Sequence, residues 1–192
     1  NWISSAGPFI EEFEKKIATY AECKFSVATA NATSGLYLSL IVAGVKPGDY
    51  VIVPDWTFSA TANAVLMAGA IPYFVDIDIK TWNIDVNLVE KVISKEGKKI
   101  TAVIAVHALG HPADMYKLRK ICDKFNVLVI EDAAAAIGSK YYGKSVGQFG
   151  DLGVFSFNGN KTLTAGAGGM IVTNSQKWAA LAKKISSQGK MG

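Results

Sequence analysis

Two kinds of hydrophobic pattern alternate along the chain. Segments in which apolar residues recur every three or four positions predict helices, and short continuous apolar runs predict buried strands. The first helix is expected to open at Pro8, where Phe9, Phe13, Ile17 and Tyr20 follow at helical spacing. The later predicted helices cover residues 34–43, 57–68, 87–94, 113–125 and 175–186, and the predicted strands cover residues 25–30, 50–53, 72–75, 100–106 and 127–130.

The order of these elements indicates the fold class. Apolar strands separated by helices are typical of an α/β protein with a mostly parallel sheet and helices on both faces. Beyond Glu131 the pattern changes, because half of the 18 glycines lie between Gly138 and Gly169 and indicate short strands and turns. No repeat, low-complexity tract or linker interrupts the sequence, so residues 1–192 are expected to form a single domain. Nothing caps or closes the end at residues 190–192, which favours a fragment of a longer chain.

Composition excludes several classes of protein. With 50% hydrophobic and 19% charged residues the chain can bury a sizeable core, which excludes intrinsic disorder. The longest apolar runs end within about ten residues, too short to span a bilayer, and no charged-then-apolar leader precedes Asn1. The two cysteines, Cys23 and Cys122, lie too far apart for a disulfide framework, and no His or Cys has metal-ligand spacing. The expected location is therefore the reducing cytoplasm.

Charge adds one informative count. The net charge of +4 comes from scattered lysines with no interleaved aromatics, which gives nucleic-acid binding little support. Arg119 is the only arginine. Bidentate recognition of a carboxylate by a guanidinium must therefore use Arg119 or a group outside this chain.

Candidate chemistry lies where predicted strands end, which is where open parallel sheets bind ligands. Residues 31–35, with sequence NATSG, follow a strand and open a helix. Hydroxyls and free backbone N–H groups at a helix N-terminus can bind an anion, although an ordinary helix cap is the alternative.

A pair of carboxylates, Glu131 and Asp132, is expected just past the apolar strand 127–130. An aspartate at this place could hold a proton on a pyridine nitrogen, or it could only cap a turn.

Lys161 stands between an apolar strand and a glycine-rich turn. An amine near an apolar or cationic site can become a nucleophile, whereas most loop lysines are simply solvated.

Two aromatic residues, Trp56 and Phe58, occupy a strand-to-helix turn. One of them could stack on a planar ligand, or both could pack in the core. Together the four features supply a phosphate cradle, a stacking ring, an acid for a ring nitrogen and a Schiff-base lysine, which are the parts that hold pyridoxal 5′-phosphate.

With these parts in place, the sequence resembles the sugar aminotransferases of the DegT/DnrJ/EryC1/StrS family, which are pyridoxal-phosphate enzymes of fold type I. The resemblance runs from Asn1 to Met191. The segments that carry it are NA at 63–64, DID at 76–78, VHALGHPADM at 106–115, EDAA at 131–134, and GD at 150–151 leading to FSF at 155–157. Within the family, TWNID at 81–85, GHPADM at 110–115 and GNK at 159–161 look most similar to the perosamine synthases.

The resemblance implies a role for each candidate residue. Lys161 would form the Schiff base with the cofactor and shuttle the proton, and Asp132 would pair with the pyridine N–H. Phe58 would stack on the ring, while Thr33, Ser34 and Ser156 would hold the phosphate. Enzymes of this kind transfer the amino group of glutamate to the C4 ketone of a nucleotide-linked 4-keto-6-deoxy sugar.

Two positions depart from the family pattern. Ala135 stands where a polar residue usually lies near the cofactor hydroxyl, and Ala167 stands where the glycine run usually carries a glutamate. The resemblance therefore implies cofactor binding, but it defines the electronic properties of the cofactor ring and the substrate preference less closely. The resemblance also implies a C-terminal small domain, absent from this chain, and a homodimer in which the neighbouring subunit helps to complete the site.

Other functions stay open at this point. Another fold-type-I reaction is one alternative, but the sugar dehydratases carry histidine in place of the lysine, and the desulfurases need a mobile nucleophilic cysteine. Cys23 and Cys122 both lie in or beside predicted helices. A fragment that binds the cofactor without turnover is the alternative outside enzymology.

Overall fold

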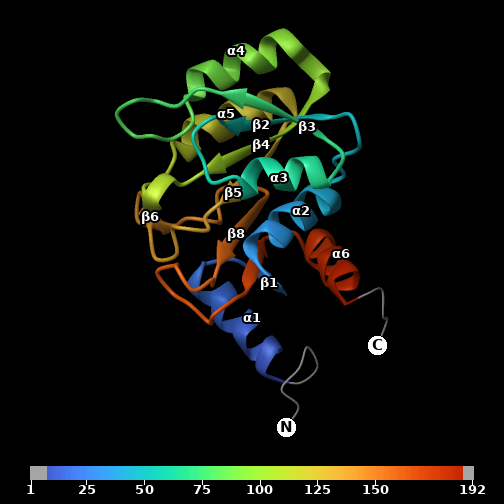
Figure 1. The fold of residues 1–192 in the computed structure, drawn as a ribbon, viewed down its shortest axis with the longest axis vertical. Helices are drawn as coiled ribbons and strands as arrows, with labels where there is room; N and C mark the ends of the chain where they lie inside the picture. The colour runs from blue at the N-terminus through green and yellow to red at the C-terminus, as the bar shows by residue number, and fades with distance from the viewer. Residues whose placement is uncertain (1–7, 188–192) are drawn as a thin grey trace.

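A seven-stranded sheet forms the centre of the fold in the computed structural model, which describes residues 8–187 (Figure 1). The strand order is β1-β9-β8-β5-β4-β2-β3. The strands are β1 Phe25–Thr29, β2 Tyr50–Pro54, β3 Ile71–Val75, β4 Ile100–Val106, β5 Leu128–Asp132, β8 Leu152–Ser156 and β9 Gly169–Thr173. The pairings from β8 through β5, β4 and β2 to β3 are parallel, while β9 is antiparallel to both of its neighbours. In the described part of the chain β9 alone runs against the rest of this sheet, which confirms the expected mostly parallel arrangement.

Helices cover both faces of the sheet. They are α1 Pro8–Tyr20, α2 Ala32–Ala43, α3 Ala60–Met67, α4 Val86–Glu96, α5 Met115–Phe125 and α6 Gln176–Ser186. Side chains of α2, α3 and α6 share one hydrophobic cluster with the sheet, whereas α4 and α5 pack on the opposite face (Figure 1). Helix α1 covers that same opposite face at β8 and β9. A two-stranded hairpin, β6 Lys140–Tyr141 and β7 Lys144–Ser145, lies outside the main sheet.

Alternation along the strands explains how one sequence builds two cores. On β2, Val51 and Val53 enter the α2 side while Ile52 enters the α4 side. The same alternation on β5 sends Ile130 to the α2 side and Val129 to the other. Neighbouring side chains at the end of β5 must therefore face opposite ways.

The structure corrects several predicted boundaries. The helix expected over residues 57–68 begins at Ala60, because residues 57–59 form a turn. The helix expected from residue 113 begins at Met115, because Asp114 caps it by accepting the Lys117 N–H. Glu131 and Asp132 lie within β5 and not past it, since Asp132 is paired with strand neighbours on both sides. The segments 1–7 and 188–192, which include the ends of the resemblance and the uncapped terminus, lie outside the described residues.

Close backbone packing at β8 depends on glycine. A Cβ atom on Gly153 would lie 2.4 Å from the carbonyl oxygen of Gly147 and 2.6 Å from its Cα. Strand β8 is buried at every position, so the backbone has little freedom to move away.

We expect Gly153→Ala to lower the free energy of unfolding by about 1–3 kcal/mol, because the added methyl group overpacks a buried strand. Urea denaturation of the full-length protein measures this. Gly159→Ala is the matched control, since the nearest atom to its added Cβ would be 4.0 Å away. Equal stability of the two variants would contradict the expectation.

Candidate active site

A cavity of about 740 Å³ opens at the carboxyl ends of the parallel strands. Five of the residues predicted for the site line it: Thr33, Phe58, Asp132, Ser156 and Lys161. Ser34 lies beside Thr33 in the first turn of α2, but it is not among the lining residues. The other lining residues are Ala30, Asn31, Ala32, Leu36, Trp56, Thr57, Ala60, Val106, His107, Ala108, Leu109, Ala134, Ala135, Asn158, Asn160 and Ala167.

The N-terminus of α2 forms one wall of this cavity. Asn31 caps the helix from an extended conformation, and its side chain accepts the Ser34 N–H at 2.8 Å. The glycine run approaches closely, because a Cβ on Gly169 would lie 2.5 Å from the Asn31 carbonyl carbon and 2.7 Å from the Ala32 nitrogen. The cap uses the Ser34 N–H, so a helix cap and an anion site at the same helix N-terminus are compatible readings of this turn.

Asp132 supplies a buried carboxylate to the cavity. The residue is 6% exposed, and its Oδ2 accepts the Thr61 hydroxyl at 2.7 Å. Its Oδ1 accepts the Ala134 N–H at 3.2 Å, so one oxygen does cap the following turn. Burial raises the pKa of Asp132 above its ordinary value, while the hydrogen bonds from Thr61 and Ala134 act to lower it. A cation in the cavity would stabilise this carboxylate, and the protonated nitrogen of a pyridine ring is one.

Lys161 lies in the loop between β8 and β9 and lines the same cavity as Asp132. Its backbone N–H donates to the Asn158 carbonyl at 3.0 Å, which holds the turn. The side chain is half-buried and makes no ion pair among residues 8–187. The amine is therefore available for a ligand instead of being committed to a surface salt bridge.

The aromatic turn after β2 opens onto the cavity. Phe58 is 76% exposed and Trp56 is 40% exposed, so the alternative that both pack in the core is wrong. Trp56 instead packs edge-on against Trp82, with ring centroids 4.9 Å apart. An exposed Phe58 ring at the cavity leaves a face on which a planar ligand can stack.

Several residues of this region were not predicted from the sequence. Four further residues line the cavity: Thr57, His107, Asn158 and Asn160. Thr61 donates a hydrogen bond to Asp132. His107 lies within the segment that carried the resemblance, but the contact of Thr61 with Asp132 spans 71 positions and has no signal in local spacing.

Glu131 takes part in a buried network on the other face of β5. His107 Nδ1 accepts the Ala113 N–H at 3.1 Å, so the proton of a neutral ring lies on Nε2 and is donated to Glu131 Oε2 at 2.9 Å. The same carboxylate accepts the N–H groups of Gly147 and Gly150. Of the two neighbouring carboxylates, only Asp132 therefore faces the cavity.

Arg119 is committed elsewhere. Its guanidinium forms ion pairs with Asp151, at 2.7 Å, and with Asp123. Asp151 Oδ2 also accepts the Val129 N–H at 2.7 Å, which ties the pair to the sheet. The only guanidinium of the chain is therefore a structural anchor and does not line the cavity.

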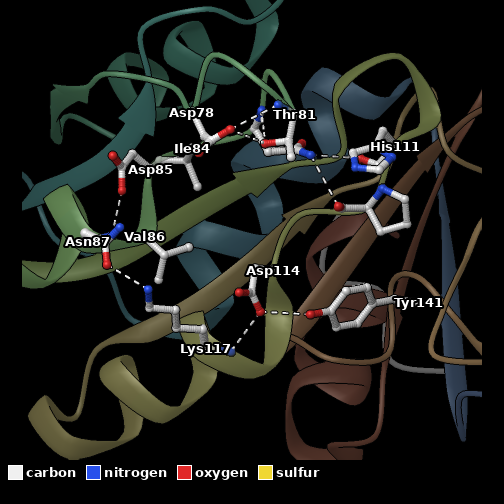
Figure 2. A pocket seen from close by; sticks show the side chains of 12 residues that line it. Asp78, Thr81, Ile84, Asp85, Val86, Asn87, His111, Asp114, Lys117 and Tyr141 are labelled. Carbon is white, nitrogen blue, oxygen red and sulfur yellow. Dashed lines mark hydrogen bonds between the residues drawn. The ribbon is translucent and has the colours of Figure 1, made fainter.

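A second cavity of about 300 Å³ lies between α4, α5 and the hairpin (Figure 2). Its polar groups already bind one another, as Figure 2 shows. Lys117 Nζ donates to Asn87 Oδ1 at 2.7 Å and the Tyr141 hydroxyl donates to Asp114 Oδ1 at 2.8 Å. Asp85 and Asp114 cap α4 and α5. None of the predicted site residues lies there, and its side chains serve the fold.

Neither cysteine belongs to the candidate site. Cys23 and Cys122 are both free thiols, and neither lines the larger cavity. Burial raises the pKa of each thiol to about 12. Because the thiolate is the reactive form, neither residue suits the nucleophile of a desulfurase.

We expect Cys23 and Cys122 to react with iodoacetamide at pH 8 more than about a hundredfold more slowly in the folded protein than in urea. Peptide mapping of the alkylated full-length protein measures each thiol separately, and the urea sample is the control. A rapid reaction of either thiol in the folded protein would reopen the desulfurase alternative.

Comparisons with known proteins bear on this site. Residues 1–192 match the family described as the DegT/DnrJ/EryC1/StrS aminotransferase family. GDP-perosamine synthase of Escherichia coli O157:H7 is 46% identical over 173 residues, covering 90% of this chain and 47% of that protein. The crystal structure of DesI in the presence of its TDP-sugar product has a TM-score of 0.91 at 37% identity, covering 98% of this chain and 47% of DesI.

A third similar protein is NtdA from Bacillus subtilis, solved with the bound cofactor PMP. It has a TM-score of 0.87 at 35% identity and covers 94% of this chain and 40% of NtdA. This chain thus spans about half the length of the relatives it matches. Within residues 8–187, no helix is both long enough and apolar enough to cross a membrane.

Proposed function

Because the chain belongs to the DegT/DnrJ/EryC1/StrS aminotransferase family, we propose that the protein uses pyridoxal 5′-phosphate to transfer the amino group of glutamate to a nucleotide-linked sugar. The acceptor would be the C4 ketone of a 4-keto-6-deoxy sugar, as in a perosamine synthase. The observation that carries the proposal is the meeting of Lys161, Asp132 and the N-terminus of α2 in one cavity.

The residues present fit the cofactor. The N-terminal turn of α2 with Thr33 and Ser34, together with Ser156, would hold its phosphate, and the exposed face of Phe58 would cover its ring. The buried carboxylate of Asp132 would keep the ring nitrogen protonated, which relieves the cost of burying an unpaired charge. When bound, the cofactor supplies an electron sink that stabilises negative charge on the carbon next to the transferred nitrogen. Lys161 would hold the cofactor covalently through Nζ and, once released, would move the proton at that carbon.

The substrate class rests on the similar proteins. One is named GDP-perosamine synthase and another was solved with a TDP-sugar product, so a nucleotide sugar is the proposed acceptor. Arg119 is held by Asp151 and Asp123, so the carboxylates of glutamate would need groups outside this chain.

The alternatives are less well supported. Lys161 stands where a dehydratase would carry histidine, and the raised pKa of both thiols disfavours a desulfurase. Cofactor binding without turnover is the remaining alternative, motivated by Ala135 and Ala167, which both line the cavity.

We expect borohydride reduction of the full-length protein with pyridoxal phosphate to label Lys161, because it alone among the lysines of residues 8–187 lines the cavity. Peptide mapping identifies the labelled residue. The same protein, incubated with glutamate and a panel of nucleotide-linked ketosugars, should form an amino sugar.

Two variants complete this test. Lys161→Ala should lose both the label and turnover, whereas Lys144→Ala, at an exposed position of β7, should keep both. Label on another lysine would contradict the role of Lys161. Labelling of Lys161 without turnover on any sugar would favour the binding alternative.

We further propose that residues 1–192 form the large, cofactor-binding domain of a protein that works as a homodimer in the cytoplasm. The matched relatives are about twice as long, and the exposed Trp56, Phe58 and Leu109 at the cavity leave apolar surface for a neighbour to cover. The free thiols suit a reducing compartment.

Sedimentation of the full-length protein at micromolar concentration should show a dimer, because twofold pairing is the commonest way in which such a surface is covered. Activity measured over the same concentrations is the companion readout. A monomer that retains full activity would contradict the shared site.

A further inference from the structure

Three oxygen atoms form a chain beneath the cavity. Thr57 Oγ1 lies 2.9 Å from Thr61 Oγ1, and Thr61 Oγ1 lies 2.7 Å from Asp132 Oδ2. Thr61 has no exposed surface, whereas Thr57 lines the cavity. This series of hydrogen bonds therefore runs from the cavity wall, through a buried hydroxyl, to the carboxylate.

The number of protons fixes the direction of these hydrogen bonds. A hydroxyl carries a single proton, and an ionised carboxylate can only accept. With Asp132 ionised, Thr61 must donate to Oδ2, so its oxygen is left to accept the proton of Thr57. Each hydroxyl then polarises the next, which strengthens the bond to the carboxylate.

Thr61 also holds the turn that presents Phe58. The Thr61 N–H donates to the Phe58 carbonyl at 3.1 Å, in the turn that delays the start of α3 to Ala60. The hydroxyl of Thr57, at the start of this turn, lies within hydrogen-bonding distance of the Thr61 hydroxyl. A single buried residue thereby joins the stacking ring to the acid expected at the ring nitrogen.

We propose that Thr61 is a positioning residue for the aminotransferase reaction, holding Asp132 ionised and aimed into the cavity with Thr57 as its donor. This inference rests on the function proposed above. The other groups that act on Asp132 are the Ala134 N–H from its own turn, His107 at the end of β4, and Lys161 from the loop after β8. Within residues 8–187, Thr61 is the one group that donates a side-chain hydrogen bond to Asp132.

The test uses variants that separate the hydroxyl from the shape of the side chain. Thr61→Val keeps the shape and removes the donor, while Thr61→Ser keeps the donor. In the full-length protein, Thr61→Val should weaken the binding of pyridoxal phosphate by about tenfold or more, since it removes a hydrogen bond to a charged group. Thr61→Ser should stay within about threefold of the wild type, for it retains that hydrogen bond. Equilibrium dialysis of the apoprotein measures the dissociation constant.

Two controls show that the effect passes through Asp132. Ser59→Ala removes an exposed hydroxyl on the same turn that makes no capping bond, and it should leave the affinity unchanged. In an Asp132→Asn background, Thr61→Val should weaken cofactor binding by a smaller factor than it does in the wild type, because the two residues act as one unit. The absorbance spectrum of the bound cofactor changes at a characteristic pH. This pH should differ from the wild-type value in Thr61→Val and equal the wild-type value in Thr61→Ser.

Each outcome has a defined meaning. Wild-type affinity in Thr61→Val, an equal loss in Thr61→Ser, or full additivity with Asp132→Asn would overturn the inference while leaving the proposed function intact. Failure of the wild-type protein to bind pyridoxal phosphate would overturn both. If Thr61→Val does not fold, Thr57→Val tests the same series of hydrogen bonds. We expect it to weaken binding by about threefold, since it removes a bond between neutral hydroxyls, and an unchanged affinity would overturn the inference.

Discussion

The burial of the Asp132 carboxylate is the constraint on which the rest of the site depends. The residue ends a strand that is paired with β4 on one side and β8 on the other, so its backbone has no freedom to carry the charge toward solvent. A buried carboxylate is stable only where hydrogen-bond donors or a cation compensate for its lost hydration. Thr61 and the Ala134 N–H supply the donors, and the cavity leaves the remaining direction to a ligand.

Because side chains alternate between the two faces of β5, its two adjacent carboxylates have different roles. On one face, Glu131 accepts hydrogen bonds from His107, Gly147 and Gly150 and so connects the loops that contain these residues to β5. Asp132, on the other face, lines the cavity. A shift of one residue in the pairing of β5 with β4 and β8 would exchange the two environments.

The chain also shows what its cavity lacks. Its single guanidinium is held between Asp151 and Asp123, while the lining is mostly alanine, aromatic, hydroxyl and amide groups around one lysine and one aspartate. Such a lining suits a planar cofactor better than it suits two substrate carboxylates and a nucleotide diphosphate. The proposed reaction therefore depends on groups beyond this chain for substrate recognition.

The sequence by itself determined the order of strands and helices and the α/β class, because the periodicity of side chains over a few neighbouring positions encodes the buried face of each element. The sequence also made Lys161 and Asp132 candidates, but local patterns left alternatives open for both, and the resemblance to the family selected them. The structure corrected the start of α3 and placed both carboxylates inside β5. It also decided that Phe58 is exposed, that Arg119 is committed, and that Thr61 supports Asp132. Those outcomes depend on contacts between segments far apart in the chain, and only the packing of helices onto a paired sheet brings such segments together.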